Sequence, residues 1–171
     1  MDYEKFYRRL FVPLESIHGP IDGDTIVAII GFEAGGPLNF CTFGRESSDR
    51  FITYVSCELA VREEQQPSEF GRYELLIACD DERWVRGIVS DIGRMSFEVP
   101  FGHGQTMDIG PWVESGESIQ GIVFEKVCAT KIDRKPYGVM RIIGVTRPEM
   151  EYTQVHTSSK LIACLRGRVG R

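Results

Sequence analysis

The spacing of hydrophobic residues predicts that short helices and strands follow one another along the chain. Near the N-terminus, apolar side chains recur at intervals of three and four residues, the period of an amphipathic helix. Asp2 precedes them as a good N-cap residue. We therefore predict one short helix over residues 2–10, which we expect to end before Pro13 because proline breaks a helix interior. The residues of its apolar face are Tyr3, Phe6, Tyr7 and Leu10.

Six apolar runs have the length and flanking turn residues of β-strands. Short connections such as AGGP and ESSD separate the first three runs, which favours an antiparallel meander, and the basic turn KIDRKP separates the last two. The fourth run is apolar enough for a central strand. The polar segment REEQQPSE before it is expected to be an exposed loop. The six runs are TIVAIIGFE (25–33), LNFCTFG (38–44), RFITYVSCELAV (50–61), RYELLIACD (72–80), SIQGIVFEKV (118–127) and YGVMRIIGVT (137–146).

Capping signals predict three further helices. Asp80 and Asp81 end the fourth strand and can cap a helix whose apolar face begins at Trp84. Thr146 and Glu149 form a capping box before a helix that includes MEYTQVH, and SSKLIACLRG supplies a last short helix. The prediction is one α+β domain over residues 1–171, with a central, largely antiparallel mixed sheet of five to six strands and helices packed against it.

Composition narrows the function. The chain has 171 residues, 42% of them hydrophobic, and a net charge of −5, so it has no basic field for nucleic acid. No run reaches the roughly 18 apolar residues of a membrane span, and the charged N-terminus does not resemble a secretory signal. We therefore expect a cytoplasmic protein without nucleic-acid or membrane partners. No cofactor is predicted, because the glycines fit neither the Walker pattern nor the dinucleotide fingerprint.

The cysteines predict neither a metal site nor a disulfide framework. Their number is odd, their spacings are wide, and no CxxC pair occurs. Most of them lie within apolar runs, so we expect buried free thiols. The five cysteines are Cys41, Cys57, Cys79, Cys128 and Cys164.

The stretch FGHGQT raises the question of catalysis. His103 lies between two glycines that allow a ligand or another backbone to approach closely. In one hypothesis His103 is the base of a small hydrolase or transferase, Asp108 orients it, and Glu74 faces the same end of the sheet. No GxSxG elbow, HExxH helix or CxxC pair supports this set, so we favour binding over catalysis and predict no catalytic residues.

The motifs, taken in order, resemble the suppressor-of-fused domain family over most of the chain. The strand–turn–strand AIIGFEAGGPLNFCTFG comes first and RFITYVSCELAV follows. GRYELLIACD then leads into a helix near Trp84, and FGHGQT falls where the family carries its histidine loop. The ending, YGVMRIIGVTRPEMEYTQVHTSSKLIACLRG, resembles the family's closing strand and helices.

The resemblance implies a mixed α/β domain that binds protein. Eukaryotic members hold a zinc-finger transcription factor of the Hedgehog pathway with the help of a second, C-terminal domain. This chain ends where that domain would begin, so we do not expect the Hedgehog role to transfer. Stand-alone bacterial members have been proposed as immunity proteins that neutralise a toxin, and acidity would steer this chain toward a basic toxin domain. A structural subunit role and a homodimer through a sheet edge stay open as alternatives.

By position in the family pattern, five residues are expected to contact the partner. The loop contributes His103, Asp108 and Trp112, and the neighbouring strands contribute Tyr54 and Tyr73. Core packing is the alternative for the two tyrosines, because strand tyrosines often bury their rings. This chain departs from the eukaryotic pattern by placing a glycine, not an acid, directly before the loop histidine, and by reading Cys57-Glu58-Leu59 where the family has a small strand end.

Overall fold

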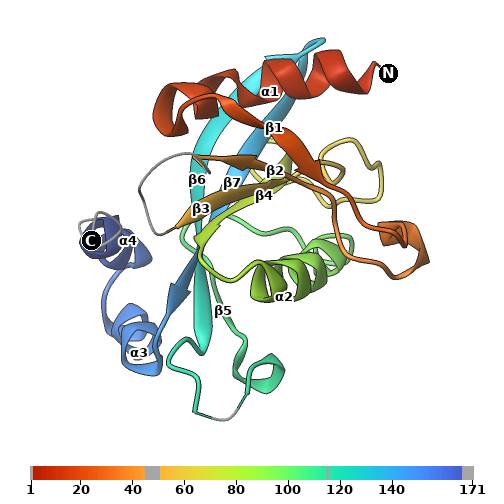
Figure 1. Ribbon diagram of the computed structural model, residues 1–171. Coiled ribbons are helices and arrows are strands. Elements are labelled where there is room, and N and C mark those ends of the chain that lie inside the picture. The colour runs from red at the N-terminus through yellow and green to blue at the C-terminus, as the bar shows by residue number, and fades with distance from the viewer. Residues whose placement is uncertain (1, 45–50, 115, 167–171) are drawn as a thin grey trace.

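A mixed β-sheet organises the chain (Figure 1). The structure is a computed structural model that describes residues 2–44, 51–114 and 116–166. Within these residues seven strands lie in the order β1-β2-β3-β4-β7-β6-β5, and every neighbouring pair is antiparallel except the parallel pair β4 and β7. The predicted fold class is confirmed, with a slightly larger sheet than expected. The strands are β1 Ile21–Ile26, β2 Phe40–Phe43, β3 Ile52–Ser56, β4 Arg72–Cys79, β5 Thr106–Asp108, β6 Gly121–Ile132 and β7 Lys135–Val145.

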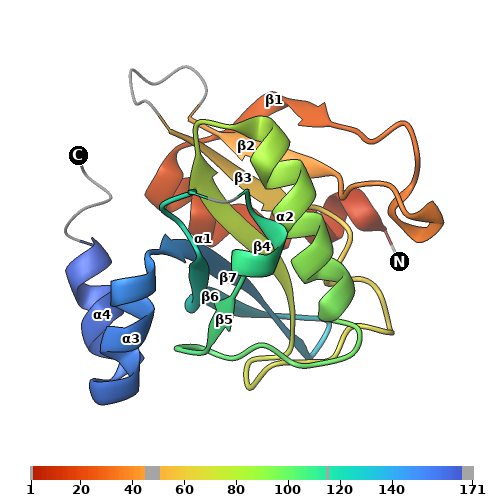
Figure 2. The same ribbon diagram turned by 90° about the horizontal axis from the view of Figure 1, so that it is seen from below.

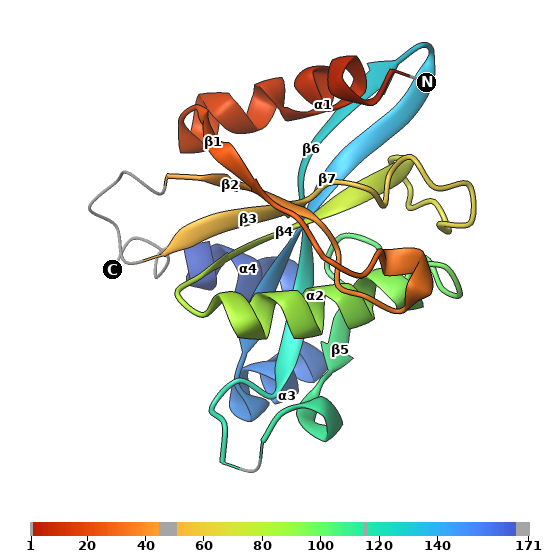
Figure 3. The ribbon, with the colours of Figure 1, turned by 45° about the vertical axis from the view of Figure 1, so that its right-hand side comes forward.

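Helices cover both faces of the sheet (Figures 2 and 3). Along β7, Tyr137 and Val139 pack with helix α1, and further along the same face, beyond Arg141, Ile143 and Val145 pack with α4. Residues of the opposite parity, such as Met140, pack with helix α2. Helices α1 and α4 therefore share one face and α2 covers the other. The helices are α1 Tyr3–His18, α2 Glu82–Met95, α3 Arg147–Val155 and α4 Ser158–Arg166, with 3₁₀ turns η1 Phe32–Ala34 and η2 Gly110–Trp112.

Asp2, Thr146 and Glu149 cap as predicted, and of the two candidates Asp80 and Asp81 it is Asp81 that caps α2. The Asp2 carboxylate accepts a hydrogen bond from the backbone N–H of Lys5, and the Asp81 carboxylate accepts two from the first turn of α2. Thr146 and Glu149 form the reciprocal capping box that begins α3. Each cap satisfies backbone N–H groups that have no partner inside the helix.

The predicted end of the first helix is wrong, because α1 continues through Pro13 to His18. Proline removes one intrahelical hydrogen bond and costs about 3 kcal/mol in a helix interior. Leu14, on the far side of the proline, is fully buried against the sheet together with Leu10 and Phe11. Burial of such side chains stabilises by about 1.5–3 kcal/mol each, so tertiary packing outweighs the local cost.

The strand predicted over residues 25–33 is also displaced, because the strand in the structure is Ile21–Ile26. Its partner β2 begins at Phe40, so Ile26 is the last residue with a backbone partner. Beyond it the chain leaves the sheet and places Val27, Ile29 and Ile30 on the surface. The pattern of apolar residues was that of a strand, but there was no neighbouring strand to pair with.

The hairpin of β6 and β7 is longer than predicted. Its turn consists of only Asp133 and Arg134, both at positive φ (50° and 69°), which is the requirement of a two-residue type I′ turn. The expected six-residue turn KIDRKP therefore belongs mostly to the strands, with Lys131 paired to Pro136. Strand β5 was not predicted, because its three residues are too few to show a period.

A buried carboxyl group on the central strand joins three parts of the fold. Glu74 of β4 is fully buried, and its side chain faces helix α1. One oxygen accepts hydrogen bonds from the Tyr7 hydroxyl (2.9 Å) and the backbone N–H of Ala60 (2.8 Å). The other accepts from the Ser56 hydroxyl and the backbone N–H of Leu59 (3.2 Å). Helix α1, strand β3 and the segment after it are thus fixed to one side chain.

Burial decides the protonation of this group. It raises the pKa of Glu74 from its ordinary 4.5 to about 7, although the four donors favour the ionised form and act in the opposite direction. Burial, and then the charge of Glu74, also raise the pKa of the Tyr7 hydroxyl well above its usual range, so Tyr7 remains a donor. Because the pKa of Glu74 is higher in the folded state, ionisation of this residue opposes folding.

We predict that the free energy of unfolding falls as the pH rises from 5 to 8. The stabilisation from the raised pKa is fully present below about 4.5 and is lost as the pH passes through about 7. The loss should be about 2–3 kcal/mol, since one unit of pKa corresponds to about 1.4 kcal/mol. Urea unfolding of the wild type and of Glu74→Gln at each pH checks this. In Glu74→Gln the free energy of unfolding should fall less steeply with pH than in the wild type, whereas the exposed control Glu64→Gln should behave as the wild type does. The same pH dependence in all three proteins would contradict the prediction.

Candidate partner-binding surface

The histidine loop, strand β5 and the turn η2 form one exposed edge of the sheet, which we call the rim (residues 102–112). The loop is held to β6 by two backbone hydrogen bonds, from Gly104 N to Phe124 O (2.8 Å) and from Phe124 N to Gln105 O (2.9 Å). Gly104 has φ of +82°, a conformation that glycine adopts without strain. Because β5 is the last strand of the sheet, its outer edge has no neighbouring strand in the described part of the chain.

His103 is exposed, but its ring is held by the backbone. Its Nδ1 accepts a hydrogen bond from the backbone N–H of Lys126 (3.2 Å), and its own backbone N–H donates to Glu69 (3.3 Å). With Nδ1 occupied as an acceptor, the neutral ring carries its hydrogen on Nε2. The outward-facing nitrogen is then a hydrogen-bond donor, which suits contact with an acceptor on a partner.

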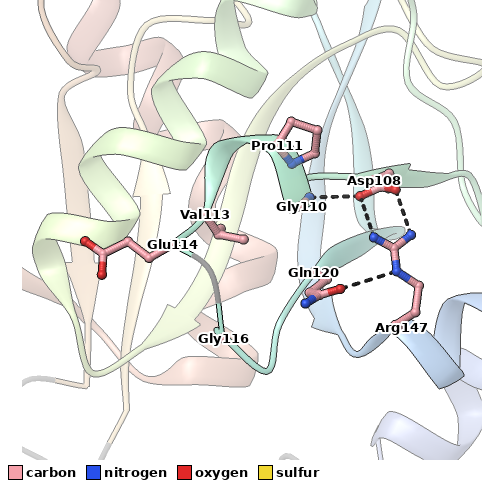
Figure 4. A pocket seen from close by; sticks show the side chains of 8 residues that line it. All are labelled: Asp108, Gly110, Pro111, Val113, Glu114, Gly116, Gln120 and Arg147. Carbon is pink, nitrogen blue, oxygen red and sulfur yellow. Dashed lines mark hydrogen bonds and ion pairs between the residues drawn. The ribbon is translucent and has the colours of Figure 1, made fainter.

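Asp108 is fixed by an arginine from another part of the sequence. Its carboxylate accepts two hydrogen bonds from Arg147 of α3 (2.7 and 3.3 Å) and one from the backbone N–H of Gly110 (2.8 Å) (Figure 4). These hydrogen bonds lower the pKa of Asp108, and those from Arg147 have the largest effect. Gln120 accepts from Arg147 Nε (3.3 Å). The pair therefore joins β5 and η2 to the start of α3.

A shallow cavity of about 440 Å³ lies beside this ion pair (Figure 4). Its walls come from the rim, from the segment that follows η2, and from α3. Trp112, the last residue of η2, is 42% exposed. Its two sequence neighbours, Pro111 and Val113, line the cavity, but Trp112 does not. The lining residues are Asp108, Gly110, Pro111, Val113, Glu114, Gly116, Gln120 and Arg147.

The structure does not bring the three residues of the catalytic hypothesis together. Glu74 is buried on the face covered by α1 and is fully hydrogen-bonded there. Asp108 is bound to Arg147, and the Nδ1 of His103 that an orienting acid would need accepts a backbone N–H. Within the described residues no cluster of three or more His, Cys, Asp or Glu side chains could hold a metal ion.

Two of the five predicted contact residues lie in the core. Tyr54 is 2% exposed and packs against Phe40, and Tyr73 is completely buried. The Tyr73 hydroxyl accepts a hydrogen bond from the backbone N–H of Phe101 (3.2 Å), and burial raises its pKa to about 12. Tyr73 thus supports the start of the rim from beneath. Their contact role is corrected to core packing, because neither side chain reaches the surface.

Sequence reasoning missed Arg147 and the acidic character of residues 98–117, the stretch that contains the rim. A cation in the first turn of a helix is opposed by the helix dipole, and this unfavourable position was the available signal that Arg147 has another task. Residues 98–117 contain four acidic side chains and no lysine or arginine. All four are exposed. They are Glu98, Asp108, Glu114 and Glu117.

Within the described residues, no helix has both the length and the apolar character needed to cross a membrane. A search of curated proteins found no match for this chain. Solved structures do match, at low sequence identity. The crystal structure of the Sufu–Fu complex has a TM-score of 0.68 and 16% identity, covering 93% of this chain and 83% of that one.

Two further structures share the fold. The Drosophila Suppressor of Fused structure has a TM-score of 0.64 and 14% identity; 90% of this chain is covered, but only 45% of that one. A putative SUFU homolog from Neisseria gonorrhoeae FA 1090 has a TM-score of 0.62 and 16% identity, covering 94% and 88%. The sequence model of the family described as Suppressor of fused protein (SUFU) matches residues 35–169. The chain therefore belongs to the suppressor of fused protein family.

Proposed function

We propose that this domain is an immunity-type protein, which binds a basic toxin domain at the rim and neutralises it. The observation that carries the proposal is the exposed Trp112 within a segment, residues 98–117, that has four exposed acidic side chains and no lysine or arginine. An excess of exposed acidic side chains accelerates association with a partner of opposite charge, even though Asp108 itself is paired with Arg147. An exposed aromatic residue in the same segment can supply the buried anchor that most interfaces need.

The architecture of the rim suits binding by a preformed surface. The ring of His103 and the carboxylate of Asp108 are each held by hydrogen bonds within the domain. Fixing these groups before contact reduces the entropy that association would otherwise cost. The shallow cavity next to Asp108 offers space for a side chain of the partner.

The relatives support protein binding as the general activity. One matched structure is that of Sufu in complex with Fu, so this fold binds a protein in that relative. The absence of an assembled set of His103, Asp108 and Glu74 removes the geometric basis of the hydrolase or transferase hypothesis. Inhibition by a stoichiometric complex requires no such set.

We predict that Trp112→Ala weakens partner binding by about 2 kcal/mol or more, roughly a thirtyfold increase in Kd. The melting temperature should change little, because the side chain is 42% exposed. Calorimetric titration of purified domain and partner measures the first quantity, and thermal unfolding measures the second. The matched control is Tyr3→Ala, an aromatic residue that is 60% exposed on α1. If only Tyr3→Ala lost affinity, the interface would lie at α1 and not at the rim.

The acidic segment that follows the rim gives a second prediction. The double variant Glu114→Lys/Glu117→Lys should slow association by roughly tenfold at low salt and flatten its salt dependence. The control Glu63→Lys/Glu64→Lys changes the net charge by the same amount at an exposed loop before β4. Stopped-flow association rates at several salt concentrations compare the two. Equal effects would mean that net charge, and not the acidic segment beside the rim, steers the partner.

The role itself is tested by capture and rescue. The tagged domain is purified from its source cells at moderate salt, and its partner is identified by mass spectrometry. We expect one basic protein at equal stoichiometry that stops growth when expressed alone and no longer does so when expressed together with the domain. If the captured partner does not stop growth when expressed alone, the domain is not its inhibitor, and a structural role would take the place of the proposed one. Turnover of a substrate by the bare domain that is lost in His103→Ala would overturn the proposal.

A further inference from the structure

Two of the five cysteines lie side by side on neighbouring strands, on the face covered by α1. Cys41 is in β2 and Cys57 directly follows β3, its antiparallel neighbour. The register pairs Phe40 with Ser56, and the backbone N–H of Cys57 donates to Asn39 O (3.0 Å), which extends the same ladder by one residue. The two sulfur atoms are 2.8 Å apart. A disulfide bond of about 2.05 Å therefore needs an approach of less than about 1 Å.

A small molecule can approach this pair from the side of Cys57. Both thiols are half-buried, in contrast to the expectation of buried cysteines, and Cys57 lines an open cavity of about 490 Å³ at the N-terminal end of α1. Tyr3 and Tyr7 line the same cavity. A peroxide fits easily into such a space. Both residues are only partly exposed and their sulfurs already lie together, so we expect the bond to form within the chain.

The two thiols differ in chemical character. The Cys57 S–H donates a hydrogen bond to the Cys41 sulfur, which lowers the pKa of the Cys41 thiol. The same bond and burial raise the pKa of Cys57. Cys41 is thus the better nucleophile, since the thiolate is the reactive form, and Cys57 is the resolving thiol.

We propose that Cys41 and Cys57 are a reversible oxidation site, which closes to an intramolecular disulfide on reaction with a peroxide. The Cys41 thiolate attacks one peroxide oxygen, the O–O bond breaks, and the leaving hydroxide takes up a proton to become water. Cys57 then attacks the Cys41 sulfenic acid, an S–S bond forms, the S–O bond breaks, and a second water leaves. Two thiols and one hydrogen peroxide give one disulfide and two waters, and a dithiol reductant reverses the change.

Closure would join β2 to β3 beneath α1, beside the carboxyl group of Glu74. The disulfide restricts the unfolded chain and fixes two strands that already pair, so the oxidised domain should be more stable. We expect a rise of about 5–10 °C in melting temperature. The site is independent of the rim, and it does not depend on the identity of the partner.

The test uses the full chain, reduced, freed of reductant and treated with an equal amount of hydrogen peroxide. We expect a mass loss of about 2 Da, one non-reduced peptide pair that links Cys41 to Cys57, and recovery of both thiols with a dithiol reductant. Cys57→Ser should lose the linkage. The matched control Cys164→Ser, which removes an exposed thiol, should form it as the wild type does.

Peptide mapping of the wild type decides the outcome even if a variant fails to fold. Thiols at 41 and 57 that stay open to alkylation after treatment would overturn the proposal. Bonds between chains through Cys164, or sulfinic acid at Cys41 without a disulfide, would overturn it as well. If the wild type forms the Cys41–Cys57 disulfide but its melting temperature does not change, the oxidation site is confirmed and the predicted stabilisation is wrong.

Discussion

The carboxyl group of Glu74 is the interaction on which the rest of the structure depends. It lies at the centre of the sheet and accepts hydrogen bonds from α1, from β3 and from the segment after β3. Burying a carboxyl group costs free energy unless its oxygens accept hydrogen bonds. Displacing any of the four donors would therefore destabilise the fold. Helix α1 and the Cys41–Cys57 pair lie on the same face of the sheet as Glu74.

The β5 edge of the sheet, which forms the rim, has a different construction. At the rim, polar groups are held by bonds that leave one side free: His103 is anchored through Nδ1, and Asp108 through Arg147. The core ends just beneath, where the buried Tyr73 hydroxyl accepts from the backbone at Phe101. The rim is thus a short exposed edge fixed to the core, with acidic side chains in it and beside it in the sequence.

Much of the secondary structure could be predicted from signals between residues close together in the sequence. The elements that were predicted wrongly depend on contacts between residues far apart in the sequence. The caps at Asp2 and Asp81 and the central strand β4 were readable because their signals are contiguous in the sequence. The continuation of α1 through Pro13, and the loss of strand structure after Ile26, depend on elements far away in the chain. At the rim, the exposed positions could be predicted from loop residues. Assignment of Tyr54 and Tyr73 to the core required the faces of the sheet to be known.

Hydrogen–deuterium exchange of the natural complex, compared with the free domain, tests the proposed binding surface most directly. The domain is isolated with its bound partner from source cells, and exchange is followed peptide by peptide. If the rim is the interface, residues 102–112 and the facing start of β6 exchange more slowly in the complex, whereas α1 is unchanged. Protection of α1 and its neighbouring cavity, with an unprotected rim, would contradict the account.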